Sequence, residues 1–256
     1  MKGISVPSLK SCLVVFCIFL FAACISSMFI TSLFHPSQRA DIAGPRLNFD
    51  GTVFREFLDS HSVFVAQASK KGCQVIFMGD SITSNWVNHP TLFSSAFGKY
   101  RTLIFGIPGD CTQHVLWRIE NGELDGARPA VIVLLIGTNN VVVLDNSAVD
   151  IAAGIRNILS AIHYRSPRTK VILIGILPRG FGLFESSNQK KISDINLLLS
   201  KFHDGFSVFF LDAENSFILP NGTVDKGLLP DLLHPNDKGY EILAELIKQK
   251  LELLIP

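Results

Sequence analysis

Five apolar runs alternate along the chain with segments whose apolar residues have helical spacing. Strands that are buried on both faces of a sheet are apolar almost throughout, whereas surface helices repeat apolar residues every three or four positions. Alternation of this kind is typical of a parallel sheet whose crossover helices cover both faces. We therefore predict an α/β fold, a three-layer α/β/α sandwich around a five-stranded parallel sheet. Its strands are predicted at residues 74–78, 101–105, 130–136, 171–177 and 206–211.

The predicted helices fill the intervals between these strands. The first, at residues 49–70, contains a polar stretch near Ser60 where it could break. Residues 35–48 contain two prolines and a glycine and show little periodicity, so we predict a linker there and a folded domain over residues 49–256. The other helices are predicted at residues 86–98, 112–122, 147–163, 187–202 and 236–254.

A charge-free segment at residues 12–34 precedes this domain. A helix needs roughly 20 apolar residues to cross a bilayer, and the segment is long enough. Lys2 and Lys10 lie before it, and positive charge keeps the preceding residues 1–11 on the cytoplasmic side. We therefore predict an N-terminal hydrophobic helix that associates with the membrane.

Three alternatives stay open for this segment. It is predicted to be a transmembrane signal anchor, or a signal peptide that is cleaved near the small residues 22–27. Residues 21–24, Phe-Ala-Ala-Cys, also resemble a bacterial lipoprotein processing site. Each alternative predicts that the folded domain is extracytoplasmic, either on a single-pass membrane protein or as a secreted protein.

Composition sets further bounds on the function. The 256 residues are 48% hydrophobic and 18% charged, enough to bury one full-sized core. Lys and Arg number 23 and Asp and Glu number 22, whereas a protein that binds a nucleic acid duplex shows a basic patch or stripe. We therefore predict no nucleic acid partner.

Two cysteines and one sequon allow alternatives that the sequence does not resolve. Cys73 and Cys111 follow the hydrophobic segment and can form a disulfide in an oxidising compartment. The sequence favours two free, partly buried thiols over the disulfide, because a core of this size needs no covalent bond to hold it. Asn221 begins an Asn-Gly-Thr sequon, which matters only for a lumenal domain in a eukaryotic cell.

Polar residues follow three of the predicted strands and precede the last helix. Ser81, Gly106 and Asn139 come after the first, second and third strands, and the loop before the last helix contains Asp231 and His234. Because the carboxyl ends of parallel strands share one edge of the sheet, we expect these residues to converge there. Each also has a purely structural explanation, as a helix cap or a turn residue. Their combination favours a site.

The chemistry that suits this set is acyl transfer. A serine hydroxyl needs a base to remove its proton, and histidine serves as that base near neutral pH. Asp231 is close enough to His234 in sequence to hold the far ring nitrogen and fix the tautomer. The amides of Ser81, Gly106 and Asn139 can donate to the oxyanion, each contributing about 3–4 kcal/mol. This chemistry needs no metal and no cofactor.

These residues resemble the four sequence blocks of the SGNH, or GDSL, hydrolases. Residues 105–124, FGIPGDCTQHVLWRIENGEL, are similar to the group that includes the catalytic subunits of platelet-activating factor acetylhydrolase Ib. The resemblance covers about residues 75–246 and departs from the group at Pro108 and Cys111. The four blocks are Gly79-Asp80-Ser81, Gly106, Gly137-Thr138-Asn139 and Asp231-Leu232-Leu233-His234.

The resemblance implies a flavodoxin-like sheet, serine esterase activity and roles for five residues. Ser81 is expected to be the nucleophile, His234 the base and Asp231 its orienting acid. Gly106 and Asn139 are expected to complete the oxyanion hole with the amide of Ser81. The related acetylhydrolase subunits pair, so a homodimer is also expected.

We therefore predict a serine esterase that hydrolyses a short-chain ester, expected to be acetyl, through an acyl-serine intermediate. The substrate class is a small-molecule, glycan or lipid acyl ester. Two other functions stay open at this point. One is a membrane-anchored O-acyltransferase that acts on glycans from the same site, and the other is a non-catalytic binding domain with the same fold.

Overall fold

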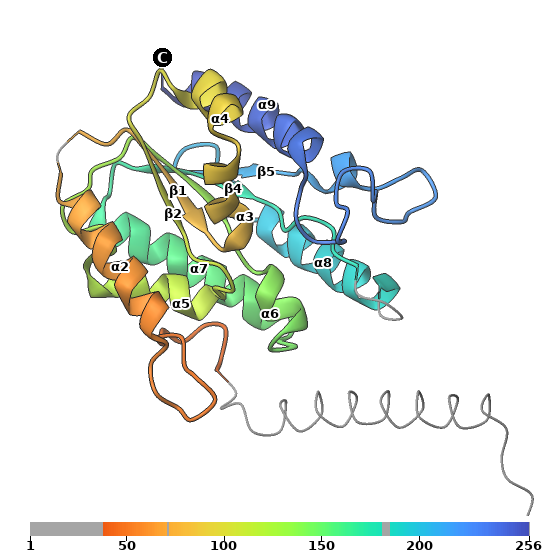
Figure 1. Ribbon diagram of the computed structural model, residues 1–256, viewed down its shortest axis with the longest axis horizontal. Coiled ribbons are helices and arrows are strands. Elements are labelled where there is room, and N and C mark those ends of the chain that lie inside the picture. Colours follow the sequence, from red (N-terminus) through yellow and green to blue (C-terminus); the bar gives the residue numbers. More distant parts are fainter. Residues whose placement is uncertain (1–37, 71, 181–184, 256) are drawn as a thin grey trace, which may run out of the picture. The chain divides into compact units, whose positions relative to one another are not determined.

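The computed structural model describes residues 38–70, 72–180 and 185–255. The described residues of 38–48 and 52–255 belong to one compact unit. Its centre is a sheet with helices packed around it (Figure 1). The sheet has five parallel strands in the order β2-β1-β3-β4-β5. The prediction of an α/β fold with five parallel strands is confirmed. The strands are β1 Val75–Gly79, β2 Thr102–Gly106, β3 Val131–Leu135, β4 Lys170–Ile174 and β5 Val208–Leu211.

The helices match the predicted intervals, with local differences. α2 passes Ser60 without a break, and its polar side faces away from the core. Two short helices, α6 and η4, were not predicted. The helical elements are α2 Arg55–Ala68, α3 Ser81–Ser84, η1 Asn85–Asn88, α4 Pro90–Phe97, α5 Thr112–Arg118, η2 Ile119–Glu123, α6 Thr138–Val142, α7 Ala148–Arg165, α8 Glu185–Ser200, η4 Glu214–Phe217 and α9 Asp237–Leu254.

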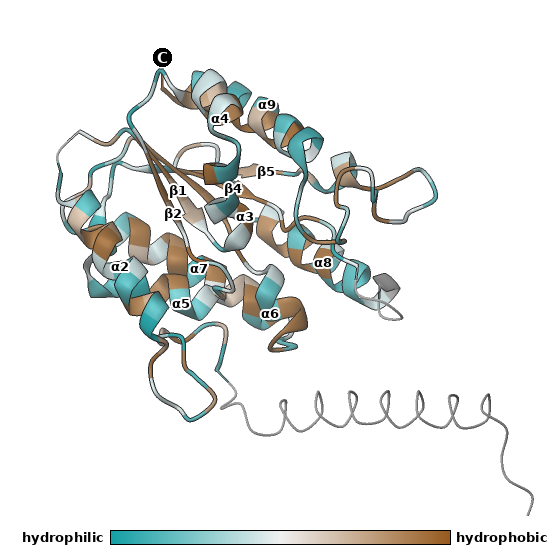
Figure 2. Cartoon of the chain, in the orientation of Figure 1, coloured by the Kyte–Doolittle hydropathy of each residue, from teal (hydrophilic) through white to brown (hydrophobic). Residues whose placement is uncertain are grey.

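Two hydrophobic clusters fill the space between the sheet and its helices. Along β1, Ile76 and Met78 join the cluster under α2, α5, α7 and α8, whereas Val75 and Phe77 join the cluster under α4 and α9. This alternation follows from the period of two in a strand. Figure 2 shows strands that are hydrophobic along their length and helices with mixed colouring. Each large apolar side chain buried in this way contributes about 1.5–3 kcal/mol.

Residues 38–48, the described part of the segment predicted as a linker, pack on the domain. Ala40 is fully buried, and its carbonyl oxygen accepts a hydrogen bond from Thr112 Oγ1 at 2.7 Å. Gly154 in α7 makes room for it, because a Cβ there would lie 2.2 Å from the same oxygen. Side chains of the segment also contact the domain: Gln38 Oε1 lies 2.9 Å from His114 Nε2, and Arg46 Nη1 donates to the carbonyl oxygen of Pro108. These contacts follow no helical or strand period, so no periodicity appears in the sequence. The rest of the predicted division into domains stays a prediction.

The predicted single-pass membrane localisation needs correction. Within the described part of the chain, no helix combines the length and the apolar composition that crossing a bilayer requires. The two 18-residue helices α7 and α9 carry charged residues on their exposed sides. The single-pass membrane protein that we predicted is therefore not supported. Residues 12–34, on which the predictions of a hydrophobic helix, an anchor or a signal peptide depended, lie outside the described residues.

Candidate active site

Three side chains from distant parts of the sequence form a continuous chain of hydrogen bonds. Ser81 Oγ lies 2.9 Å from His234 Nε2, and His234 Nδ1 lies 2.7 Å from Asp231 Oδ2. The first two residues are 153 positions apart in the sequence. An imidazole that binds a carboxylate at Nδ1 keeps its proton there and presents a basic Nε2 to the hydroxyl. The structure therefore brings the predicted nucleophile, base and acid together.

The loop before α9 holds the acid and the histidine in register. Asp231 Oδ1 accepts hydrogen bonds from the amides of Leu233 and His234, at 3.0 and 2.7 Å. Leu232 adopts a positive φ of 63°, which turns the chain tightly between Asp231 and His234. Partial burial of Asp231 opposes its ionisation, yet these amides and the His234 ring hold the pKa of its carboxyl below the usual value. The acid is therefore a carboxylate at neutral pH.

Ser81 is placed by the junction of β1 and α3. In a sheet of this order, ligands bind beyond the carboxyl ends of the strands next to β1, where the connections change direction. Ser81 is the first residue of α3 and lies two residues beyond the end of β1. Tyr240 in α9 donates a hydrogen bond from its hydroxyl to the carbonyl oxygen of Ile82 at 2.7 Å. The helix that follows His234 is thus tied to the helix that carries Ser81.

Gly106 lies beside this junction at the end of β2. It pairs in register with Gly79, the last residue of β1. A Cβ on Gly106 would lie 2.3 Å from the amide nitrogen of Ser84 and 2.8 Å from the carbonyl oxygen of Asp80. Only glycine fits so close an approach, and the residue therefore lies against the backbone that leads into Ser81.

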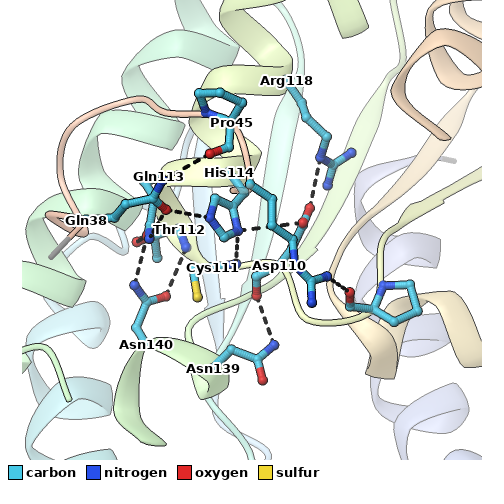
Figure 3. A network of polar contacts seen from close by, with 12 residues as sticks. Gln38, Pro45, Asp110, Cys111, Thr112, Gln113, His114, Arg118, Asn139 and Asn140 are labelled. Atoms are coloured by element: carbon cyan, nitrogen blue, oxygen red, sulfur yellow. Dashed lines mark hydrogen bonds and ion pairs between the residues drawn. The ribbon is translucent and has the colours of Figure 1, made fainter. Parts of the chain in front are cut away.

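Asn139 comes from the first turn of α6, directly after β3. Gly137, two residues before it, has a φ of 122°, a backbone angle that residues other than glycine rarely adopt. Asn139 is 6% exposed, and its Nδ2 donates a hydrogen bond to the carbonyl oxygen of Asp110 at 2.9 Å (Figure 3). The Asp110 carbonyl thus fixes the rotation of the carboxamide, and the same nitrogen carries a second N–H group.

Asp80 is a buried carboxyl immediately before Ser81. It is 1% exposed, and its Oδ1 accepts a hydrogen bond from the amide of Ile82 at 2.9 Å, while Oδ2 accepts none from the described residues. Burial raises the pKa of Asp80 to about 6, although the Ile82 amide, His234 and Arg179 favour the carboxylate. An Asp in an unfolded chain titrates near ~3.9. The folded state therefore binds the proton more tightly.

This difference predicts how stability depends on pH. The Asp80 carboxyl contributes its full stability below pH ~4, and the contribution is lost as the pH rises through about 6, a change of about 3 kcal/mol. Asp80→Asn keeps an acceptor for the Ile82 amide and has no proton to lose. The melting temperature of the variant relative to the wild type should rise by about 6–12 °C between pH 4 and pH 8. A difference that stays constant over this range would contradict the assignment.

Several residues at the site were missed in the sequence. Arg179 follows β4 and is 9% exposed; its Nη1 donates to the carbonyl oxygen of Thr138 at 3.1 Å, directly before Asn139. Arg118 is fully buried behind the site, next to Asp110. The position of Arg118 on the apolar side of α5 was a usable signal, because a charge among buried helical positions needs a buried partner.

The described residues show the state of two cysteines and whether side chains that commonly bind metals are grouped together. Cys73 and Cys111 are both free. Cys111 is buried at the start of α5, and burial raises the pKa of its thiol far above the usual value. No group of three or more His, Cys, Asp and Glu side chains in the described ranges is arranged to hold a metal ion.

Comparisons with known proteins identify the family of the chain. Residues 77–242 match the GDSL-like Lipase/Acylhydrolase family. The human platelet-activating factor acetylhydrolase IB subunits alpha2 and alpha1 are 36% and 35% identical over 203 and 200 residues. These alignments cover 77% and 78% of this chain and 85% and 84% of the relatives. The crystal structure of a GDSL-like lipase from Bacteroides thetaiotaomicron has a TM-score of 0.65 and 25% identity, covering 78% of this chain and 98% of that one.

The match spans both ends of the candidate site, since it includes Ser81 and His234. The names of the relatives describe hydrolysis, and neither transfer to glycans nor a non-catalytic role gains support from them. The resemblance seen in the sequence is confirmed. The chain belongs to the GDSL-like lipase/acylhydrolase family and is a hydrolase that acts on esters.

Proposed function

We propose that this ester hydrolase removes a short acyl group, with acetyl as the preferred one, through an acyl-Ser81 intermediate. The observation that carries the proposal is the chain of hydrogen bonds from Ser81 through His234 to Asp231, at 2.9 and 2.7 Å. Both distances are within the range that proton transfer and orientation require. The proposal assigns Ser81 as nucleophile, His234 as general base and acid, and Asp231 as the residue that orients the imidazole.

The proposed reaction has two halves. In the first, Ser81 Oγ attacks the ester carbonyl carbon while His234 Nε2 takes the hydroxyl proton, and the proton then passes to the departing alkoxide. In the second, a water molecule gives a proton to His234 and attacks the acyl carbon, and the ester bond to Ser81 breaks with return of the proton. Asp231 stays ionised and stabilises the imidazolium in both halves.

The carbonyl oxygen becomes negative in each half and needs fixed donors. We assign that role to the backbone amides of Ser81 and Gly106 and to the carboxamide of Asn139. The close packing of Gly106 on the backbone before Ser81 and the fixed rotation of Asn139 support the assignment. Donors held in advance stabilise the transition state because they need no reorganisation when the charge appears.

The preference for acetyl rests on the relatives. Two of them are named acetylhydrolases, and they align with most of this chain. The alcohol part of the substrate, whether a small molecule, a glycan or a lipid, stays a prediction at the level of an acyl ester. Pairing of two chains, expected from the same resemblance, also stays a prediction.

Hydrolysis of a series of aryl esters tests the proposed acyl preference. The purified protein should hydrolyse p-nitrophenyl acetate with a kcat/KM at least about tenfold above that for the octanoate, because a pocket that fits two carbons excludes a long chain. Equal or higher kcat/KM for the octanoate would contradict the acetyl preference. It would leave the serine mechanism intact.

A fluorophosphonate probe tests the nucleophile separately. The wild-type protein and Ser95→Ala, in which an exposed serine of α4 is replaced, should both be labelled, and Ser81→Ala should not. Ser95→Ala is a matched control because it also removes a serine hydroxyl from a short helix, but from α4 instead of α3. Labelling of Ser81→Ala to the wild-type extent would exclude Ser81 as the nucleophile.

A further inference from the structure

Arg118 at the end of α5 makes a set of contacts that no mechanistic step uses. Its side chain is 0% exposed. Nη1 donates to Glu123 Oε1 at 2.5 Å. Nε lies 3.0 Å from Asp110 Oδ2, as Figure 3 shows for Arg118 and Asp110. Nη2 donates to two backbone carbonyl oxygens, those of Gly79 and Phe105, each at 3.3 Å. One planar group therefore contacts four partners through its three nitrogen atoms.

Three of these partners lead directly to the proposed oxyanion donors. Gly79 ends β1 two residues before Ser81. Phe105 precedes Gly106 at the end of β2. The third partner is Asp110, whose backbone carbonyl accepts the hydrogen bond from the Asn139 carboxamide. A single guanidinium thus contacts each of the three backbone segments on which the geometry of the oxyanion hole depends.

We propose that Arg118 is a positioning residue that holds these three segments in the arrangement needed to stabilise the oxyanion. The inference rests on the proposed function. A buried ion pair alone would not explain the choice of residue, because such pairs add little net stability over apolar packing. The guanidinium presents five donors in a fixed plane, whereas a lysine ammonium is one point charge that cannot reach both carboxylates and both carbonyls. The fourth partner, Glu123, pairs with Nη1 and is fully buried with it.

Arg118→Lys tests the proposal because it keeps the charge and removes the fork. We expect kcat for p-nitrophenyl acetate to fall about 10- to 100-fold, with KM within about threefold, because displaced donors affect the transition state more than the bound ester. The second readout is the inhibition constant of an alkyl trifluoromethyl ketone. The Ser81 oxygen adds to its carbonyl carbon, the proton passes to His234, and the carbonyl oxygen becomes an oxyanion in the hole.

The inhibition constant separates positioning from a merely structural role. It should rise by the same factor by which kcat/KM falls, since both report on the oxyanion donors. A variant that is only partly folded would lose activity in proportion to the folded fraction, with an unchanged inhibition constant. That result, or a wild-type kcat, would overturn the proposal.

Arg165→Lys is the matched control. Arg165 also pairs with a carboxylate, Asp125, and donates to a carbonyl oxygen, that of Glu120, but neither partner is adjacent in sequence to Ser81, Gly106 or Asn139. Its kcat and inhibition constant should stay within about twofold of the wild type, since exposed ion pairs contribute little. Equal losses in Arg165→Lys and Arg118→Lys would overturn the proposal.

Asp110→Ala covers the case in which Arg118→Lys does not fold. It cuts the link between Arg118 and the Asn139 segment and leaves Arg118 balanced by Glu123. We expect kcat to fall at least about tenfold, with a matching rise in the inhibition constant. An unchanged inhibition constant would overturn the role of the link. Absence of esterase activity in the wild type would refute the proposed function itself, which is a distinguishable outcome.

Discussion

Replacing Ser81 with alanine is expected to lower kcat for an aryl acetate by about 10⁴- to 10⁶-fold, with little change in KM. The variant keeps the sheet edge, the amides and the His234–Asp231 pair, and it loses only the oxygen that we propose forms the acyl intermediate. Residual activity would come from water activated beside the oxyanion donors. Steady-state kinetics on highly purified protein, with active wild type excluded from the preparation, measure the effect.

Three further observations accompany this expectation. The burst of p-nitrophenol that accumulation of an acyl-enzyme produces should be absent from Ser81→Ala. Ser95→Ala on α4 should retain kcat within about threefold, since exposed sites away from special features tolerate substitution. A Ser81→Ala protein with more than one tenth of the wild-type kcat would refute the acyl-serine mechanism.

Replacing His234 with alanine is expected to have the second largest effect, again about 10⁴- to 10⁶-fold in kcat. In the wild type, His234 Nε2 lies 2.9 Å from Ser81 Oγ. Without this base the hydroxyl of Ser81 stays protonated. Asp231→Asn should cost less, roughly 10⁴-fold, because the imidazole remains but its tautomer is no longer fixed. The order of these three losses is measurable with one substrate at one pH.

The double variant gives the sharper measurement. Residues that act as one unit are not additive, so Ser81→Ala combined with His234→Ala should be no slower than either single variant. Multiplied losses would mean that the two residues act independently, which contradicts a shared proton transfer. His203→Gln is the control: His203 is exposed and uses Nδ1 only to accept a hydrogen bond from the amide of Phe210 at 3.1 Å. Its kcat should stay within about threefold of the wild type.

The sheet and the residues at its edge could be predicted because each depends on a local pattern. Apolar runs mark the parallel strands, and in a parallel sheet the residue after each run lies at the binding edge. Ser81 and Asn139 follow directly from this rule. The partnership of Asp231 with His234 needed only their short spacing, which one loop brings to 2.7 Å.

Other features depend on tertiary contacts that a one-dimensional pattern does not contain. α6 begins at Thr138 and consists of Thr, Asn and Val, which have weak helix propensity, so neighbouring elements impose the helix. The burial of Asp80 and Arg118 depends on which elements close over them. Residues 38–48 are held through the buried carbonyl oxygen of Ala40 and through the side chains of Gln38 and Arg46, and these contacts follow no regular spacing in the sequence.

The separation of Ser81 and His234 has a consequence for synthesis of the protein. The two residues are 153 positions apart, and the second lies shortly before the last helix. During translation, Ser81, β1 and α3 are therefore synthesised long before His234. The nascent chain is expected to have no esterase activity until translation is almost finished. Catalytic competence then arises together with completion of the fold.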